Sequence, residues 1–153
     1  MNFITRTAIA AAVLLALASI VGSALAGDAK EEANRKVVLD FYEKGLNQKD
    51  ADAAIALMGN RYVQHNPNAA DGPEGFRKFI GFLKEKFPNS RSEIKRSFVD
   101  GDYVILHVHA VREPGTRGSA IVDIFKLENG RIVEHWDAVQ PIPETSANNN
   151  GMF

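Results

Sequence analysis

Hydrophobic residues between residue 31 and residue 87 recur every three or four positions, which is the period of an amphipathic helix. The pattern predicts one helix over Glu31–Leu46 and a second, short helix that Asp50 caps and that runs to Met58. A third helix is predicted over Glu74–Phe87, with Pro73 in its first turn. Residues 61–66, between the second and third helices, are expected to be extended. This half of the chain is therefore predicted to be mainly helical.

After Pro88 the hydrophobic pattern becomes that of β-strands, which are predicted over Ser92–Val99, Tyr103–Arg112, Ser119–Leu127 and Arg131–Gln140. Asp100-Gly101 and Asn129-Gly130 are two-residue signals for β-hairpins. Helices followed by an antiparallel meander predict an α+β fold, in which a curved antiparallel sheet wraps around the N-terminal helices. We expect a cone-shaped, cystatin-like α+β barrel over residues 27–144 with a pocket inside, and a disordered tail over residues 145–153.

The first 26 residues have the pattern of an export signal. Arg6 supplies a positive charge, residues 8–21 are apolar, and Ala24-Leu25-Ala26 matches a cleavage site for small residues. The apolar run is short for a transmembrane helix, although an uncleaved anchor is the alternative. We therefore expect a mature chain from Gly27, periplasmic or secreted, without stable membrane insertion after cleavage.

Composition narrows the possible chemistry. The chain has no cysteine, so disulfides and thiol catalysis are excluded, and the hydrophobic core alone must stabilise the fold. Its formal net charge is −1, and it has no basic block of the kind that binds nucleic acid. A neutral or lightly charged small molecule is the expected ligand, and no cofactor is expected.

Three ionisable residues fall on strand faces that are otherwise apolar. Asp123 lies in the strand predicted over 119–127, and His135 and Asp137 lie in the next one. Side-chain alternation gives them apolar neighbours on the same face: Ile121, Phe125 and Leu127 beside Asp123, and Val133 and Val139 beside the other two. A buried carboxylate or imidazole must be satisfied, and this is how a small acid/base pocket is built. The alternative is that these faces are exposed to solvent.

Three segments carry a family resemblance: Tyr62-Val63-Gln64-His65-Asn66-Pro67, Val122-Asp123-Ile124-Phe125 and Gly130-Arg131-Ile132-Val133-Glu134-His135-Trp136-Asp137. With the predicted order of elements, they resemble the SnoaL-like polyketide cyclase family of the nuclear transport factor 2-like superfamily. The resemblance covers nearly the whole mature chain. It is specific for the fold but not for a reaction, because one fold hosts many activities.

The superfamily includes the ketosteroid isomerases, which use a carboxylate base and an oxyanion hole of one tyrosine and one protonated aspartate. The resemblance places Asp123 at the oxyanion aspartate and Tyr42, eight residues before Asp50, at the oxyanion tyrosine. His65 stands at the position of the base, and His135 and Asp137 are expected to join the same site. It implies a cofactor-free acid/base enzyme for a hydrophobic carbonyl compound: an aldol-type cyclase, isomerase or dehydratase. The alternative is a non-catalytic binding module for a hydrophobic small molecule.

His107 and His109 share one strand face, and three interpretations of that face are open. The pair could line the pocket, lie on an exposed or interface surface, or take part in a metal site. We predict substrate binding by His107, His109, Phe125 and Val139, and no metal. Both faces of the last two strands are largely apolar, which predicts a homodimer through the outer face of the sheet. Trp136 is expected on that outer face.

Overall fold

The computed structural model describes residues 27–153. The predicted export signal, residues 1–26, lies outside the described residues, so cleavage after Ala26 and a periplasmic or secreted location remain proposals. Among the described residues, no helix is both long and apolar enough to cross a membrane.

The three predicted helices are present. The first covers residues 27–42 and continues into a π-helical turn, η1 (Glu43–Asn47). The second, α2 (Ala51–Ile55), begins after Asp50, whose carboxylate accepts a hydrogen bond from the Ala53 backbone N–H at 3.0 Å. This N-cap confirms the predicted helix start. The helix ends before Met58 because the chain turns there and enters the first strand. The third helix is α3 (Gly72–Lys86), with Pro73 in its first turn.

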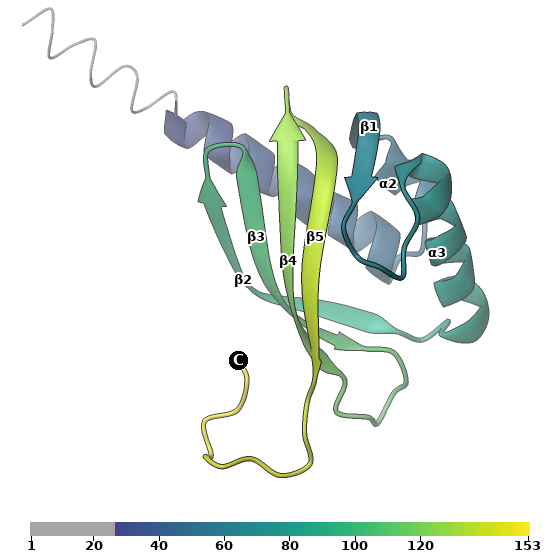
Figure 1. Ribbon diagram of the computed structural model, residues 1–153, viewed down its shortest axis with the longest axis vertical. Coiled ribbons are helices and arrows are strands. Elements are labelled where there is room, and N and C mark those ends of the chain that lie inside the picture. The colour runs from purple at the N-terminus through teal and green to yellow at the C-terminus, as the bar shows by residue number, and fades with distance from the viewer. Residues whose placement is uncertain (1–26) are drawn as a thin grey trace, which may run out of the picture.

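Five strands form one curved sheet in the order β1-β5-β4-β3-β2. Their bounds are β1 Met58–Gln64, β2 Arg91–Asp100, β3 Tyr103–Val111, β4 Ser119–Glu128 and β5 Arg131–Pro141. The last four are antiparallel, as predicted, but β1 pairs with β5 in parallel. The predicted α+β class is confirmed, and the edge strand is the departure from an antiparallel sheet (Figure 1). Two parallel strands are joined by a long connection, so no local turn motif in the sequence indicates that β1 and β5 pair.

The two-residue hairpin predicted at Asn129-Gly130 is present. Asn129 and Gly130 have φ angles of 51° and 71°, and Glu128 pairs directly with Arg131. Two successive positive φ angles define a type I′ turn, whose twist suits a right-handed strand pair. At the other hairpin Asp100 pairs with Tyr103, so the loop is Gly101-Asp102, one residue later than the signal itself.

A β-bulge at Val133 changes which residues of β5 face inward. Lys126 pairs with Glu134, but the next residue of β4, Leu127, pairs with Ile132, so Val133 has no partner. The completely buried Ile132 therefore lies on the inner face with His135. The prediction that Val133 shares this face with His135 was wrong, because simple alternation ignores the extra residue.

The hydrophobic core lies between the helices and the inner face of the sheet. The first helix contributes Val38 and Phe41, and α3 contributes Phe76, Ile80 and Leu83. The sheet contributes a matching set of buried residues, among them Val104, Leu106, Val108, Phe125, Leu127 and Ile132. In Figure 1 the first helix crosses behind the sheet while α3 lies beyond its β1 edge. The helices thus cover one face of the sheet only.

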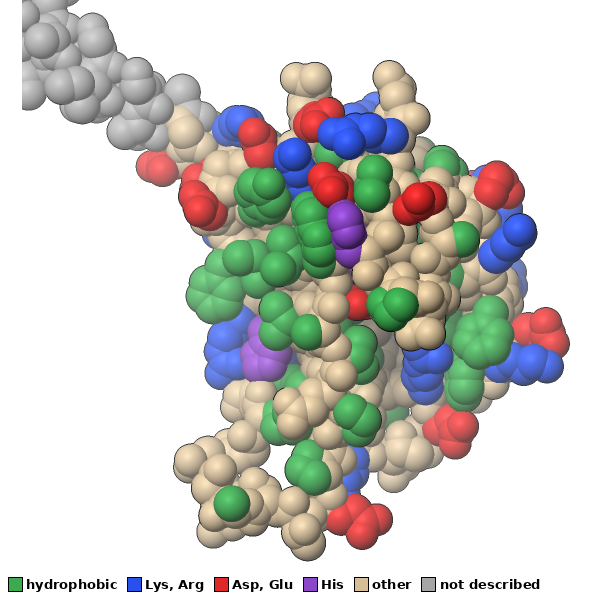
Figure 2. Space-filling view, in the orientation of Figure 1, with side chains coloured by type: hydrophobic (Ala, Val, Ile, Leu, Met, Phe, Trp, Pro, Cys, Tyr) green, Lys and Arg blue, Asp and Glu red, His purple; other side chains and the backbone are tan. Residues whose placement is uncertain are grey.

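The outer face of the sheet carries a continuous hydrophobic row. Phe98, Ile105, Ile124 and Trp136 are successive cross-strand partners from β2 to β5. Figure 2 shows hydrophobic side chains gathered over these strands on the face away from the helices. After β5, the segment 145–153 contains no helix or strand, and the Phe153 ring lies 4.8 Å from the His109 ring on this face. Its predicted disorder stays a prediction.

Candidate active site

A cavity of about 900 Å³ opens between the helices and the inner face of the sheet. Its wall is mostly apolar and aromatic and includes Phe41, Phe76, Phe79, Phe125 and Val139. Cavities that hold small organic molecules have this size and lining, with a few polar groups that orient the ligand. Phe125 and Val139 therefore occupy the positions predicted for substrate-binding residues.

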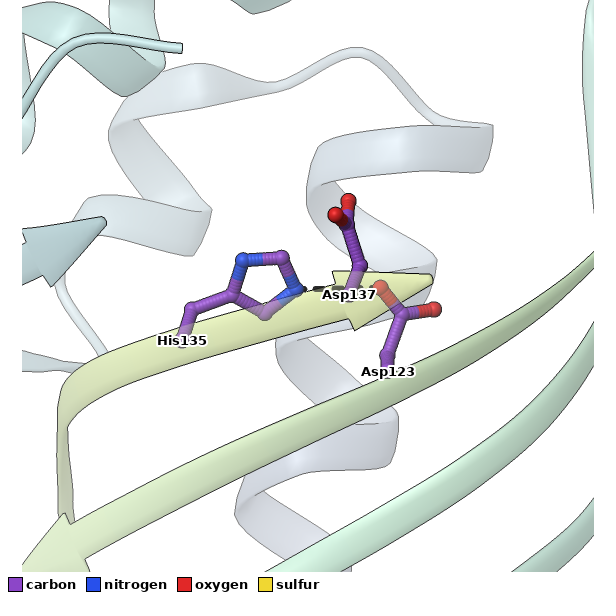
Figure 3. A group of neighbouring side chains, drawn as sticks. All are labelled: Asp123, His135 and Asp137. Atoms are coloured by element: carbon purple, nitrogen blue, oxygen red, sulfur yellow. Dashed lines mark hydrogen bonds and ion pairs between the residues drawn. The ribbon is translucent and has the colours of Figure 1, made fainter. Parts of the chain in front are cut away.

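Asp123, His135 and Asp137 converge on this cavity from two neighbouring strands (Figure 3). Asp123 on β4 pairs directly with Asp137 on β5, which sets the two side chains next to each other on the inner face. Asp123 and His135 are only 4% and 7% exposed, while Asp137 is half-buried. One nitrogen or oxygen atom from each of the three residues lies within 4.8 Å of the others. The structure therefore brings these three predicted site residues together in one part of the cavity.

Hydrogen bonds around His135 fix the position of one proton. The Asn66 backbone N–H donates to Gln64 Oε1 at 2.9 Å, so this oxygen is an acceptor. It lies 2.9 Å from His135 Nδ1, which must therefore carry a hydrogen and donate to it. His135 Nε2 lies 3.0 Å from Asp123 Oδ1. That contact is a hydrogen bond only if Asp123 and His135 share one further proton, held on either the acid or the imidazole.

Tyr42 completes this group from the first helix. Its hydroxyl donates to Asp123 Oδ2 at 3.0 Å, which confirms the predicted proximity of Tyr42 and Asp123. Burial, with the negative field of Asp123 as the next cause, raises the pKa of Tyr42 well above its usual value. Tyr42 therefore stays protonated and acts as a donor. Burial also raises the pKa of Tyr62, whose hydroxyl accepts a hydrogen bond from the Gln64 amide.

These two tyrosines should make the fold sensitive to alkali. Because each phenol has a folded pKa above its unfolded value near 10, its stabilisation is complete below about pH 10 and is lost as pH rises toward the folded pKa. Each phenol should cost about 1.4 kcal/mol of unfolding free energy per pH unit in that window. Urea unfolding at pH 9 and pH 11 should show a smaller loss for Tyr42→Phe than for the wild type. An equal loss in both proteins would contradict this origin.

Asp137 is the carboxylate that remains open to the cavity. Asn66 Nδ2 donates to both of its oxygens, at 2.8 and 2.7 Å. Two ionised carboxylates side by side repel each other, but the proton shared with His135 compensates the charge of Asp123. The arrangement therefore combines a carboxylate that accepts hydrogen bonds on both oxygens, Asp137, with a hydrogen-bonded acid group, Asp123 with His135. By distance the three side chains could also hold a divalent cation, although Tyr42, Gln64 and Asn66 satisfy them with hydrogen bonds.

His65 does not join the site, so its predicted position as the base is wrong. Its Nε2 lies 2.9 Å from Glu134 Oε1, and its ring stacks on Trp136 at 4.6 Å with an interplanar angle of 4°. Both partners lie on the outer face of the sheet. Side chains alternate along β1, so the buried Tyr62 and the half-buried Gln64 point inward and His65 must point outward. The same alternation is the signal in the sequence from which Gln64 could have been identified.

His107 and His109 also lie outside the cavity, and their predicted role as pocket-lining residues is wrong. The inward positions of β3 are Val104, Leu106 and Val108, all completely buried, so the histidines alternate to the outer face. His109 Nε2 donates to the Arg117 backbone carbonyl at 2.8 Å. Of the three interpretations of this pair, the surface position is the one observed.

Several known proteins are similar to this chain in sequence pattern or fold. The model of the SnoaL-like domain family matches residues 38–135. A protein proposed to be a SnoaL-like polyketide cyclase, from Jannaschia sp. CCS1, is 22% identical and superposes with a TM-score of 0.59 over 72% of this chain and 87% of its own. A cystatin-fold protein from Novosphingobium aromaticivorans is also 22% identical, with a TM-score of 0.59 over 69% and 97% of the two chains.

A third similar structure is AclR, a proposed hydroxylase from Streptomyces galilaeus. It is 15% identical, with a TM-score of 0.58 over 72% of this chain and 81% of its own. No curated protein matches the sequence. At these identities the solved structures establish the fold alone, and a fold does not determine which reaction its site carries out.

Proposed function

Because the chain belongs to the SnoaL-like domain family, we propose that it is a cofactor-free enzyme that moves a proton at the carbon next to a carbonyl group of a hydrophobic compound. Asp137 is the base in this proposal and takes the proton from carbon. Tyr42, Asp123 and His135 form the hydrogen-bonded group that stabilises, or protonates, the carbonyl oxygen as it becomes negative.

The observation that carries the proposal is the pattern of hydrogen bonds within one apolar cavity. Asp137 accepts hydrogen bonds from the Asn66 amide on both of its oxygens. Asp123 and His135 share a proton, and Tyr42 adds a second donor. A base and an acid in adjacent positions can act at the two ends of an enolising carbonyl compound. The apolar wall strengthens both interactions by lowering the local dielectric constant.

Aldol-type cyclisation, isomerisation and dehydration all pass through such an enolate. A common step can be tested without a known substrate. The purified protein should catalyse exchange of α-hydrogens for deuterium in activated aryl ketones and β-keto esters in D₂O, followed by NMR. Saturable binding of such compounds without exchange would instead favour the non-catalytic binding module. Absence of both would contradict any role of the cavity toward carbonyl compounds.

A homodimer is proposed through the outer face of the sheet. Val122 pairs with His107 on that face, beside the hydrophobic row. Phe98 and Val122 are 56% and 42% exposed, and exposed apolar surface over one sheet face commonly marks an interface. Light scattering at micromolar concentration should give twice the monomer mass for the wild type and the monomer mass for Val122→Lys. Phe82→Lys, which places the same charge at an exposed hydrophobic position of α3, should stay dimeric. A monomeric wild type would contradict the proposal.

A further inference from the structure

A second, smaller cavity of about 590 Å³ adjoins the main one, and we call it the annex. The two cavities share four wall residues: Asn68, Ala69, Phe79 and Arg112. Because these residues border both spaces, the annex lies directly beside the main cavity on its α3 side, within reach of a long ligand.

The charges that line the annex differ in sign from most of those in the main cavity. In the part of the chain that the structure describes, the ionisable residues of the annex wall are Lys78 and Arg112, both cationic. The main cavity has four carboxylates in its wall, from Glu113, Asp123, Asp137 and Glu144, and its cations are Arg117 and the shared Arg112. An elongated ligand thus meets a negative group at Asp137 and two positive groups in the annex.

Neither cation of the annex pairs with an acidic side chain within residues 27–153. The neighbour one turn before Lys78 is Glu74, but its carboxylate binds Arg77 Nε at 3.3 Å instead. The Arg112 guanidinium lies over the Phe87 ring, 5.6 Å from its centre. This contact holds the guanidinium in position without using its hydrogen-bond donors. Arg112 is therefore free to bind an anion.

The remaining wall of the annex contains two aromatic residues, Phe79 and Phe82, beside small and polar ones. Phe79 lines both cavities, and Phe82, which is 44% exposed, meets Phe87 edge to face at 5.7 Å between ring centres. Phe87 in turn lies under Arg112 and also lines the main cavity. An apolar ligand can therefore remain in contact with aromatic rings from the main cavity to the two cations.

We propose that the annex binds the acidic group of the ligand, so that the substrate class is an apolar carbonyl compound that carries one anionic group such as a carboxylate. This inference rests on the proposed function of the main cavity and adds an orientation to it. The anionic end would be attracted by Lys78 and Arg112 and repelled by Asp137, so the uncharged carbonyl end would lie at the catalytic carboxylate.

Two fluorescent probes with the same skeleton test the annex. 1-Anilinonaphthalene-8-sulfonate is anionic, and N-phenyl-1-naphthylamine is its counterpart without the sulfonate. The wild type should bind the sulfonate more tightly, and Arg112→Gln and Lys78→Gln should each weaken it about fivefold while changing the neutral probe less than about twofold. Lys84→Gln removes the same charge from α3 at a position that lines neither cavity, and should leave both affinities unchanged.

The outcomes distinguish failure of the annex proposal from failure of the proposed function of the main cavity. If both probes bind equally, or if Lys84→Gln weakens the sulfonate as much as Arg112→Gln, the annex is not an anion site, and the proposed function stands. If neither probe binds, the cavity does not hold apolar ligands, and both proposals fail. Displacement of the sulfonate by the neutral probe should confirm a shared cavity, and circular dichroism should show that each variant is folded.

Discussion

Asp137→Asn should lower the rate of α-hydrogen exchange by about 10²- to 10⁴-fold, the usual contribution of a general base. The asparagine keeps the shape of the side chain and can still accept a hydrogen bond from Asn66, but it loses the negative charge and cannot take a proton at neutral pH. The expected loss is therefore in kcat rather than in folding. NMR-detected exchange in D₂O with the best ketone of the panel, together with a thermal unfolding curve, measures both.

Asp123→Asn and His65→Ala complete this test. The amide that Asp123→Asn introduces can still accept a hydrogen bond from Tyr42, but it has no carboxyl proton to share with His135, so exchange should again fall strongly. His65 lies on the outer face against Trp136 and Glu134, so His65→Ala should change the rate less than about twofold. Full activity of Asp137→Asn combined with an inactive Asp123→Asn would overturn the assignment of roles, since the base would then be the Asp123–His135 pair.

Alternation within a single strand was enough to predict which face of the sheet some site residues occupy. Alternation placed Asp123 beside Phe125 on the inner face, and the hairpin at Asn129-Gly130 brought the next strand alongside, so His135 and Asp137 followed. The Tyr42 contact came from a family resemblance and not from periodicity. It joins residues that are 81 positions apart in the chain, and no local pattern contains that information.

The prediction for His65 was wrong because shifting the start of a strand by one residue exchanges the residues on its two faces. β1 begins at Met58, and its inward residues are Tyr62 and Gln64, so His65 belongs to the other face. The extended segment predicted from Arg61 did not show that Gln64, rather than His65, points into the cavity. The partner of β1 is the last strand of the sheet, in parallel, and only that pairing brings Gln64 to His135. The predicted pocket position of His107 and His109 was wrong because alternation along β3 places Leu106 and Val108, both completely buried, on the inner face instead.

Polar groups that orient the site are harder to predict than the site itself. Asn66 lies beyond the end of β1, in the turn before α3, and its amide reaches Asp137. Asp71, immediately before α3, does not cap that helix through its side chain but accepts the Gln64 backbone N–H at 2.7 Å. The loop between β1 and α3 is thereby tied to the strand, and the position of Asn66 depends on this tertiary contact.

Phe125→Ala should have the largest effect on stability, about 3 kcal/mol of unfolding free energy in urea, at the lower end of the range for buried phenylalanines. Phe125 is 1% exposed, and its ring centre lies 5.7 Å from that of Phe41 and 4.6 Å from that of His135. The loss should be at the lower end because one side of the ring borders the open cavity. Such a loss is a large fraction of the roughly 5–15 kcal/mol typical of a domain.

Phe82→Ala is the matched control, because the same side chain is removed from a position that is 44% exposed on α3. It should cost less than about 1 kcal/mol. Phe125→Leu should restore most of the stability but only part of the activity, because leucine fills the volume without the flat face beside the His135 imidazole. Equal destabilisation by Phe82→Ala and Phe125→Ala would contradict the placement of Phe125 in the core. Full activity of Phe125→Leu would show that the hydrogen bonds to Gln64 and Asp123 are sufficient to orient His135.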